Sequence, residues 1–469
     1  MAILIIGFAV ISGLSCSSDK TTKSSADAIA PAAITNITAA AHAATSITLT
    51  WTAPGDDSIS GQAAQYDIRY SPGPITDNNW NNAIQASGEP RPRSSGMPDT
   101  FKVDGLYWNT RYYFAIKTAD EVPNWSGISS PMHDSTRTGT WQPLGSGVAN
   151  SQGEASVFAL TIYQGQLIAS GAFNSAGGAS ANNVAAWDGN TWSPLGIGPD
   201  GRVIALAVYN DKLIVGGFFQ TAGGYTVNNI AAWDGGTWSW LGSGTNATIF
   251  SLAVYNNKLI AAGMFNVAGS DSAKYIASWD GTSWSPLGLG TDEWVYTMGL
   301  YNNQLMVGGL FQHAGNAPAA SIASWNNSYW SAVAGGTNGT VMSLGAYNSL
   351  LIAGGGFTNA GNTQVQNIAA WDGTFWSTLG DGFDGMVSSL GKYENHLVAG
   401  GVFLHSGSAP INQIAVWHDG FWAPLGAGIS GGTAPYVTAI MEFNGRLVIG
   451  GSFLTAGGTS VNCIASWGD

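Results

Sequence analysis

The sequence predicts an all-β protein with an N-terminal sandwich of short strands and a longer region of repeated four-stranded units. Glycine supplies 65 of the 469 residues and tryptophan supplies 20, whereas charged residues make up only 9% of the chain. Abundant glycine and aromatic residues with little charge are typical of strands joined by tight turns. A tryptophan that recurs every 46 residues over most of the chain indicates the repeats.

The charge and cysteine content exclude several classes of protein. Lysine and arginine total 15 against 28 acidic residues, which gives a formal net charge of −13. Nucleic-acid binding depends on clustered basic side chains, so we expect no nucleic-acid partner. The two cysteines, Cys16 and Cys463, are too few for a disulfide framework or a multi-cysteine zinc site. We therefore expect no cofactor.

The first residues predict an export signal. Residues 2–11 are almost wholly apolar, which suits a signal-peptide core but is too short to span a bilayer. The following Gly13-Leu14-Ser15-Cys16 resembles the lipobox of bacterial lipoproteins, although Gly13 stands where that family usually has leucine. The resemblance implies that residues 1–16 end in a lipidated Cys16. The alternative is an ordinary secretory signal that is cleaved nearby.

An anchored protein of this kind would be exported to the outer membrane or cell surface, and without the lipid it would be secreted. Membrane contact is then expected only through the lipidated N-terminus. Residues 17–32 are rich in serine, threonine and alanine and predict a flexible tether.

Residues 33–138 predict a β-sandwich. Residues 46–51, 66–70 and 112–118 alternate apolar and polar side chains, as half-buried strands do. Pro54-Gly55-Asp56-Asp57 is a turn signal between the first two of these strands. Several short strands within about 100 residues are typical of a sandwich.

This stretch resembles a fibronectin type III domain. The matching residues are Trp51 in T-L-T-W-T-A-P, Tyr66 in Y-D-I-R-Y, and Leu106 and Tyr112 in G-L-Y-W-N-T-R-Y. The resemblance implies that Trp51 lies in the core and that Tyr112 is the corner tyrosine. Such a domain is usually a spacer or an adhesion module.

Residues 139–469 contain seven repeats. After a first interval of 51 residues, the tryptophan that opens each unit recurs every 46 residues, at Trp141, Trp192, Trp238, Trp284, Trp330, Trp376 and Trp422. A second tryptophan recurs in each unit, at Trp187, Trp233, Trp279, Trp325, Trp371, Trp417 and Trp467. A period of about 40–50 residues with four strand-like segments is typical of a propeller blade.

One unit illustrates the four predicted strands. Residues 203–209, 213–219, 230–233 and 238–242 are apolar runs, and Asp234-Gly235 between the last two is a strong hairpin signal. The Gly-Gly of the second strand, the W-D-G-x-x-W turn and the closing L-G resemble a kelch-type repeat in all seven units. The resemblance implies a seven-bladed β-propeller.

The two ends of the repeat region differ in phase. The seventh unit stops at residues 464–469, before a fourth strand, whereas residues 141–145 are a fourth strand with no unit before it. We predict that residues 140–145 complete the blade that holds residues 437–467. This N-terminal strand would close the propeller and leave no exposed edge.

The loops after the second and fourth strands vary among the repeats and should share one face, where rigid scaffolds present binding residues. One position before each first strand should surround the channel mouth: Ser156, Arg202, Thr248, Trp294, Thr340, Met386 and Tyr436. The candidate ligand-binding residues are Arg202, Asp292, Glu293, Trp294, Met386 and Tyr436. An exposed tryptophan beside acids suits stacking on a sugar ring. The alternative is a Trp294 that plugs the channel or packs on a neighbouring loop.

No catalytic or metal-binding set emerges. Asp292 and Glu293 are adjacent in the chain and make a poor glycosidase pair. Cys463 is expected at an outer strand as an unreactive thiol, and Asp381 with Asp384 offers fewer oxygens than Ca²⁺ prefers. Four propeller histidines are interpreted as occupying unrelated repeat positions without metal-ligand spacing: His313, His396, His405 and His418.

A further prediction concerns the sixth position of the first strand, which is apolar in five repeats and therefore expected to be buried or channel-lining. The sixth and seventh repeats carry Lys392 and Glu442 there, and pairing would relieve the cost of burying each charge. The alternative is that both face water and never meet.

Taken together, these patterns predict a monomeric, non-catalytic surface protein for binding or adhesion, whose partner is an extracellular glycan or a surface protein. The alternative is an enzyme acting on extracellular polysaccharide with its site at the channel mouth. A third hypothesis is a structural envelope protein that binds nothing small.

Overall fold

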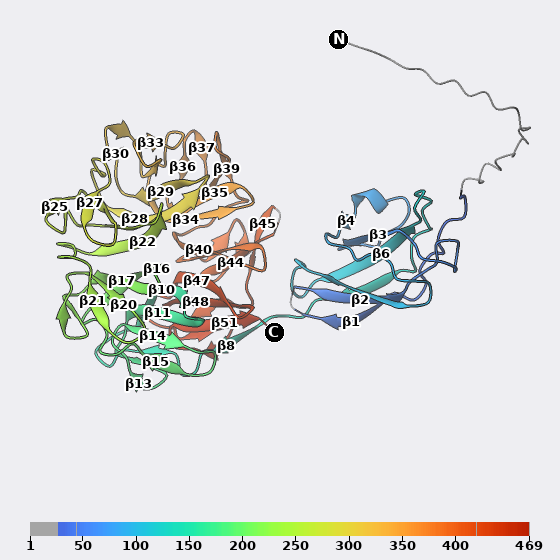
Figure 1. The fold of residues 1–469 in the computed structure, drawn as a ribbon, viewed down its shortest axis with the longest axis horizontal. Helices are drawn as coiled ribbons and strands as arrows, with labels where there is room; N and C mark the ends of the chain where they lie inside the picture. Colours follow the sequence, from blue (N-terminus) through green and yellow to red (C-terminus); the bar gives the residue numbers. More distant parts are fainter. Residues whose placement is uncertain (1–26, 44, 419, 469) are drawn as a thin grey trace, which may run out of the picture. The chain divides into compact units, whose positions relative to one another are not determined.

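The computed structural model describes residues 27–43, 45–418 and 420–468. The predicted signal and Cys16 lie outside these residues. The described residues form two compact units: residues 27–40, 48–101 and 112–134 belong to the first, and residues 41–43, 45–47, 102–111, 135–418 and 420–468 to the second (Figure 1). The only helical element described is the single turn η1 (Trp80–Asn82), so the all-β prediction is confirmed.

The first unit is built from two antiparallel sheets. One has the order β1-β2-β5 and the other the order β4-β3-β6-β7. Alternate residues of β2 are buried, with Ile47 and Leu49 fully enclosed and Trp51 packed edge-on against Tyr66 at 5.1 Å between ring centroids. The strands are β1 (Thr38–His42), β2 (Ile47–Thr52), β3 (Gln65–Ser71), β4 (Ile84–Gln85), β5 (Pro98–Val103), β6 (Arg111–Ala119) and β7 (Met132–Ser135).

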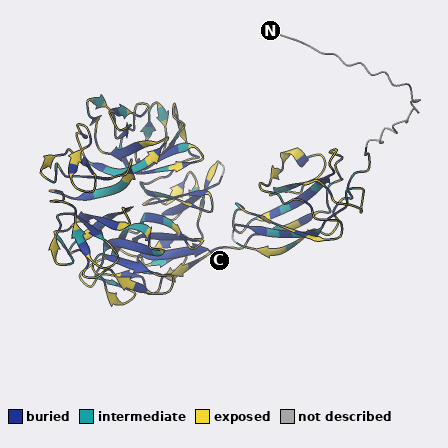
Figure 2. Ribbon diagram, viewed as in Figure 1, coloured by how far each residue is buried: buried dark blue, intermediate teal, exposed yellow. Residues whose placement is uncertain are grey.

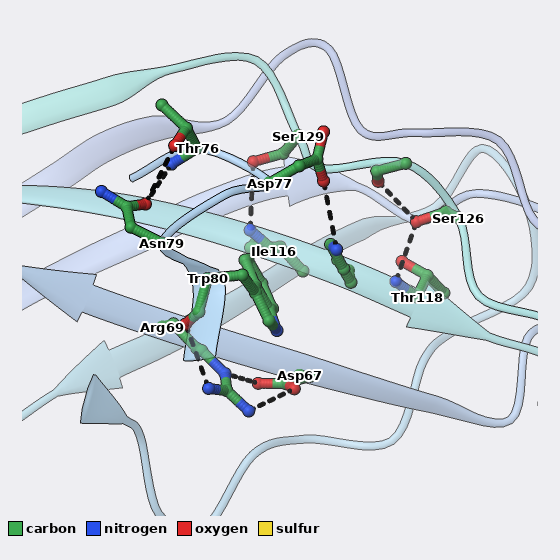
Figure 3. A network of polar contacts seen from close by, with 12 residues as sticks. Asp67, Arg69, Thr76, Asp77, Asn79, Trp80, Ile116, Thr118, Ser126 and Ser129 are labelled. Atoms are coloured by element: carbon green, nitrogen blue, oxygen red, sulfur yellow. Dashed lines mark hydrogen bonds and ion pairs between the residues drawn. The ribbon is translucent and has the colours of Figure 1, made fainter. Parts of the chain in front are cut away.

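A buried tryptophan with two cations on its ring joins η1 to the second of these sheets (Figure 3). The guanidinium carbon of Arg69 lies 5.1 Å and the ammonium of Lys117 4.6 Å from the centroid of Trp80. Asp67 pairs with Arg69 at 2.9 Å and Asp77 with Lys117 at 3.2 Å, so each cation keeps a carboxylate partner. Cation–π contacts of this kind are worth about 0.5–2 kcal/mol.

The second unit contains seven four-stranded antiparallel sheets, and six of them have their strands in chain order. The first six sheets are, in turn, β10 (Ser156–Tyr163), β11 (Gln166–Ala172), β14 (Val184–Trp187), β15 (Trp192–Pro194); β16 (Arg202–Tyr209), β17 (Lys212–Phe218), β20 (Ile230–Trp233), β21 (Trp238–Trp240); β22 (Ile249–Tyr255), β23 (Lys258–Gly263), β26 (Ile276–Trp279), β27 (Trp284–Pro286); β28 (Val295–Tyr301), β29 (Gln304–Gly309), β32 (Ile322–Trp325), β33 (Trp330–Ala332); β34 (Thr340–Tyr347), β35 (Leu350–Gly356), β38 (Ile368–Trp371), β39 (Trp376–Thr378); and β40 (Val387–Tyr393), β41 (His396–Gly401), β44 (Ile414–His418), β45 (Phe421–Pro424).

The seventh sheet combines both ends of this unit. It runs β47 (Tyr436–Phe443), β48 (Arg446–Ser452), β51 (Ile464–Gly468) and then β8 (Thr140–Pro143). Ala465 lies opposite Pro143, and Trp467 lies opposite Trp141. The predicted pairing of the N-terminal strand with the last repeat is therefore confirmed, and β51 has no open edge.

The first strands of the seven sheets neighbour one another in sequence, from β10 through β16, β22, β28, β34 and β40 to β47, and β47 in turn neighbours β10. In Figure 1 these strands lie toward the middle of the unit and the fourth strands toward its outside. The second strands between them are buried over almost their whole length, as Figure 2 shows. A strand that is covered on both sides explains why these segments are continuous apolar and glycine runs.

Short two-residue strands build the connection between the second and third strands of each sheet. Within the described ranges, no helix has the length and apolarity that crossing a bilayer requires. The short strands are β12 (Ser175–Ala176), β13 (Ala179–Ser180), β18 (Thr221–Ala222), β19 (Tyr225–Thr226), β24 (Val267–Ala268), β25 (Asp271–Ser272), β30 (His313–Ala314), β31 (Ala317–Pro318), β36 (Asn359–Ala360), β37 (Thr363–Gln364), β42 (His405–Ser406), β43 (Ala409–Pro410), β49 (Thr455–Ala456) and β50 (Thr459–Ser460), and two more, β9 (Val148–Ala149) and β46 (Ile429–Ser430), lie before the first strands of the first and seventh sheets.

Each sheet is joined to the preceding one by the tryptophan of its fourth strand. In six of the seven sheets the indole N–H donates to the carbonyl of the leucine that follows the preceding fourth strand, as from Trp238 to Leu195 at 2.8 Å. The exception is Trp376, whose indole nitrogen is buried without a partner and whose preceding sheet has Val333 in place of the leucine.

A tyrosine at the end of the first strand joins each of the first four sheets to the next one. The hydroxyl of Tyr163 donates to the carbonyl of Asp211 at 3.2 Å, and the same bond recurs 46 residues later from Tyr209 to Asn257. It recurs again from Tyr255 to Asn303 and from Tyr301 to Ser349. Each sheet in this stretch is thus tied to both neighbours by a side chain that reaches a backbone carbonyl.

The predicted ion pair between Lys392 and Glu442 is wrong. Both side chains are exposed, no ion pair joins these two described residues, and a Glu442 carboxylate oxygen instead accepts from the backbone N–H of Glu394 at 3.1 Å. The equivalent Ile162 and Leu300 are also exposed. Apolar residues are common on protein surfaces, so the apolar composition of this position did not indicate burial.

The tryptophan bonds predict a difference between two otherwise matched variants. Trp238→Phe and Trp376→Phe remove the same part of a buried ring, but only the first removes a hydrogen bond. We expect W238F to lose roughly 1–3 kcal/mol more free energy of unfolding than W376F, because the Leu195 carbonyl loses its indole donor. Guanidinium melts followed by circular dichroism measure both values. Equal losses would show that the indole bond does not stabilise the junction.

Candidate functional site

In the turns between the third and fourth strands, an aspartate carboxylate accepts hydrogen bonds from backbone N–H groups of the same turn. The Asp234 carboxylate accepts from the N–H groups of Gly236 and Thr237 at 2.9 and 2.8 Å, and these bonds hold its pKa below the ordinary value. Asp280 makes the same turn, with Thr282 and Ser283 as donors. Backbone bonds from Ser283 and then Thr282 lower the pKa of Asp280 further than that of most such acids. An ionised acceptor with both donors supplied by its own turn is suited to a structural role.

At the opposite ends of the first strands, a β-bulge occurs at the same place in all seven sheets. In the fourth sheet the register shifts between Val295 and Thr297, so that Tyr296 is the extra residue. Bulges change the direction of a side chain and are common beside functional sites. The bulged residues are Phe158, Ile204, Phe250, Tyr296, Met342, Ser388 and Thr438.

A glycine in the second strand makes room for each bulge. A Cβ on Gly309 would collide with the carbonyl oxygen of Trp294, and a Cβ on Gly217 would collide with that of Arg202. The second glycine of the Gly-Gly pair is therefore required by a close backbone approach. Sequence reasoning missed the bulged residues, although this recurrent glycine was a signal for them.

Two neighbouring sheets place three aromatic rings together at this end. Phe250 on β22 lies 5.2 Å from Tyr296 and 6.4 Å from Trp294, between ring centroids. Trp294 stands edge-on to Tyr296 at 6.3 Å. All three side chains are half-buried. We call Phe250, Trp294 and Tyr296 the aromatic cluster.

An acid lies close to this cluster. Glu293 is exposed and precedes Trp294 in the chain. Burial raises the pKa of Tyr296, and the nearby Glu293 charge raises it further. The cluster therefore combines flat apolar surface with a neutral phenol and a carboxylate. Such a surface is able to cover one face of a ligand ring and accept hydrogen bonds from its hydroxyl groups.

The predicted site residue Asp292 is engaged elsewhere. One of its carboxylate oxygens accepts from the backbone N–H groups of Gln312 and His313 at 2.8 and 2.9 Å, and the other lies 2.8 Å from Nδ1 of His313. Burial would raise its pKa, but the bonds from His313 outweigh burial and hold the pKa below its ordinary value. Asp292 thus joins the loop before β28 to β30.

The same contact corrects the interpretation of two histidines. Asp384 accepts from the N–H groups of Leu404 and His405, and its second oxygen lies 2.8 Å from Nδ1 of His405. His313 and His405 stand two periods of 46 residues apart, so their repeat positions are equivalent rather than unrelated. The 46-residue spacing was the signal that sequence reasoning missed. Asp384 is used in the same way as Asp292, and Asp381 is exposed.

The other candidate residues are distributed over separate sheets. Arg202 is exposed at the start of β16, and Met386 is exposed immediately before β40. Tyr436 is half-buried at the start of β47, with its hydroxyl 3.3 Å from Oγ of Ser156. The structure therefore brings Glu293 and Trp294 together with Phe250 and Tyr296, and it places Arg202, Met386 and Tyr436 on other sheets.

Three acids in the first unit come close together. Ligand atoms of Asp27, Asp56 and Glu121 lie within 4.8 Å of one another. Burial raises the pKa of Asp56, and the charge of Glu121 adds to the effect. With one ligand atom from each residue, the cluster offers three of the six to eight oxygens that Ca²⁺ takes.

Comparison with known proteins identifies the first region. Residues 32–132 match the fibronectin type III domain family. No curated protein matches the chain. Among solved structures, the fibronectin type III domain of the human fibronectin type III domain containing protein 3 is 17% identical, with a TM-score of 0.17, and the match covers 24% of this chain and 92% of that one.

Two further structures are similar over different lengths. The sensor domain of the anti-sigma factor RsgI4 from Pseudobacteroides cellulosolvens is 16% identical, with a TM-score of 0.16, and the match covers 24% of this chain and 96% of that one. Three fibronectin domains of chicken CNTN1 are 11% identical, with a TM-score of 0.19 and coverage of 64% of this chain and 95% of that one.

The acid-holding turns predict a dependence of stability on pH. A carboxylate whose pKa is depressed on folding stabilises the protein above its unfolded pKa of about 4, and this stabilisation is lost as the pH falls below that value. Asp280→Asn keeps the acceptor oxygen without the charge, as Asn326 does naturally in the fourth sheet. We expect the melting temperature of D280N to fall less between pH 6 and pH 3 than that of the wild type.

The matched control reverses the exchange. Asn326→Asp introduces a carboxylate into an equivalent turn, so its melting temperature should fall more steeply over the same range. Identical acid profiles for D280N, N326D and the wild type would refute the role assigned to these turns.

Proposed function

We propose that this protein is an exported, non-catalytic binding protein that recognises an extracellular carbohydrate through the aromatic cluster. The repeat region is, in this proposal, a kelch-like seven-bladed β-propeller. The cyclic order of the first strands and the pairing of β8 with β51 support that architecture. A fibronectin type III domain fits a binding or adhesion-type role, and here it serves as a spacer or a second adhesion module.

The observation that carries the proposal is the grouping of Phe250, Trp294 and Tyr296 beside Glu293. The flat rings provide the apolar surface that covers the C–H face of a sugar, and the carboxylate accepts from its hydroxyl groups. Asp292 and Glu293 have different roles, since the Asp292 carboxylate accepts from backbone N–H groups of the described chain and the Glu293 carboxylate does not. This division supports binding rather than acid–base catalysis by the pair.

A cluster of aromatic rings also suits a protein ligand, and a surface protein is the other partner class of the proposal. Arg202, Met386 and Tyr436 extend the binding face around the remaining first strands. The protein acts as a monomer in the proposal, and its location is the cell surface or outer membrane.

The glycan prediction uses the full chain and a panel of neutral polysaccharide fragments. Trp294→Ala should weaken binding by about tenfold, because a stacked ring contributes roughly 1 kcal/mol beyond the area that it buries. Thr340→Ala changes the equivalent position of the next sheet and should leave affinity unchanged. Calorimetry measures the affinities, and an assay for reducing ends runs beside it. Release of product would favour the polysaccharide-acting enzyme, and equal binding by W294A would refute the site.

Anchoring is proposed to depend on Cys16, which lies outside the described residues. Cys16→Ala should move the protein from the membrane fraction into the soluble fraction, because an acylated cysteine is the proposed membrane contact. Fractionation and metabolic labelling with a fatty acid measure the change. Membrane partitioning that persists in C16A without incorporated label would contradict lipidation.

A further inference from the structure

The repeat is interrupted in two places, and both interruptions border the same cavity. Successive positions before the first strands are 46 residues apart up to Met386, but Tyr436 follows after 50. The loop that leads to Ser156 is also longer, because Ser156 follows Trp141 by 15 positions, whereas Arg202 follows Trp192 by 10. The two lengthened loops lie before β10 and β47, which are neighbouring strands.

In three of the regular repeats, the loop before the next first strand is held by an asparagine. Asn229 has a positive φ of 70°, donates from its amide to the carbonyl of Thr245 at 2.8 Å and accepts from the N–H of Phe219. Asn183 holds Pro199 and Asn367 holds Phe383 in the same way. This clamp fills the space between the loop and the connection of the preceding sheet.

The equivalent residue of the seventh sheet is Cys463, also at a φ of 70°. Its thiol reaches the carbonyl of Ala155 at 3.2 Å, next to Ser156, rather than a carbonyl three residues before the first strand. The shorter side chain and the displaced loop leave a cavity of about 310 Å³. The two insertions and the cysteine therefore coincide at one place.

The lining of this cavity defines the ligand. Val148, Ala155, Phe453, Leu454 and Cys463 supply apolar surface, and the Cys463 thiol stays neutral because burial, with a further contribution from the Glu154 charge, raises its pKa. Glu154 is the only charged residue of the lining.

Glu154 is positioned from the second lengthened loop. One of its carboxylate oxygens accepts from the hydroxyl and the N–H of Thr433, and its other oxygen bonds to no described residue. A half-used carboxylate over an apolar cavity favours a ligand with a cationic or hydrogen-donating group and disfavours an anion. A volume of about 310 Å³ is at the lower end for ligand pockets, which indicates a small molecule.

We propose that this cavity, between the lengthened loops of the first and seventh sheets, is a binding site for a small organic amine with an apolar body. The body occupies the space beside Phe453 and Cys463, and the ammonium group meets Glu154. The site uses none of the residues of the aromatic cluster, so it does not depend on carbohydrate binding.

The test uses three probes of similar shape and different charge: benzylamine, benzyl alcohol and phenylacetate. Ligand-observed NMR titration of the full chain measures each dissociation constant. We expect benzylamine to bind in the millimolar range, benzyl alcohol more weakly and phenylacetate least. Absence of benzylamine binding, or equal binding of phenylacetate, would overturn the proposal.

Three variants locate the site. Glu154 is exposed, and Glu154→Gln should weaken the affinity for benzylamine by about two- to fivefold, as expected for the loss of a solvent-accessible ion pair. The affinity for benzyl alcohol should be unchanged. Ala155→Leu should abolish binding of all three probes by filling the cavity. Ala247→Leu makes the same change at the equivalent position of a regular loop and should leave binding intact. Unchanged benzylamine affinity in E154Q would refute the site even if A155L fails to fold.

Discussion

The second unit depends on one constraint. At each junction between sheets, buried backbone carbonyls and indole nitrogens need hydrogen-bond partners in the neighbouring sheet. A fourth-strand tryptophan donates to the preceding sheet, and a first-strand tyrosine donates to the next one. An unsatisfied buried polar group costs about 1–3 kcal/mol, so each junction penalises a displaced sheet. The bond from Trp141 to Leu425 belongs to the same series, and Trp192 continues it by donating to Leu144 beside β8. The N-terminal strand therefore takes part in two junctions as well as in the pairing with β51.

This regular arrangement explains why the candidate sites occur where the repeat is broken. Five sheets share one loop length before the first strand, and in three repeats this length allows an asparagine to hold the next loop. The proposed amine site occurs where both loops are longer and Cys463 stands at the position of these asparagines. The aromatic cluster arises differently, because the bulge is present in every sheet and only the side-chain type varies. One scaffold thus presents two kinds of surface, one from an altered loop length and one from altered residues.

The division between structural and available acids has a simple physical basis. Asp234 and Asp280 lie in turns whose own N–H groups point at the carboxylate, and Asp292 and Asp384 accept from the N–H groups of a neighbouring connection. These bonds stabilise the ionised form and occupy its oxygens. Glu293 accepts no such backbone bond from the described residues, and Glu154 uses only one of its two oxygens on Thr433, so these are the acids that the proposals assign to ligands.

The sequence by itself determined the all-β class, the fibronectin type III region and the pairing of residues 140–143 with the last strand. Periodicity carries this information, because a strand missing from one end of a repeat must be supplied by the other. The sequence predicted only part of the aromatic cluster beside Glu293. Phe250 and Tyr296 join the cluster through a bulge, which is a register shift between strands. The tertiary structure alone decided that Lys392 and Glu442 are exposed and that Asp292 binds His313. It alone also placed two insertions, far apart in the chain, around one cavity, because contact between β10 and β47 exists only once the chain has closed on itself.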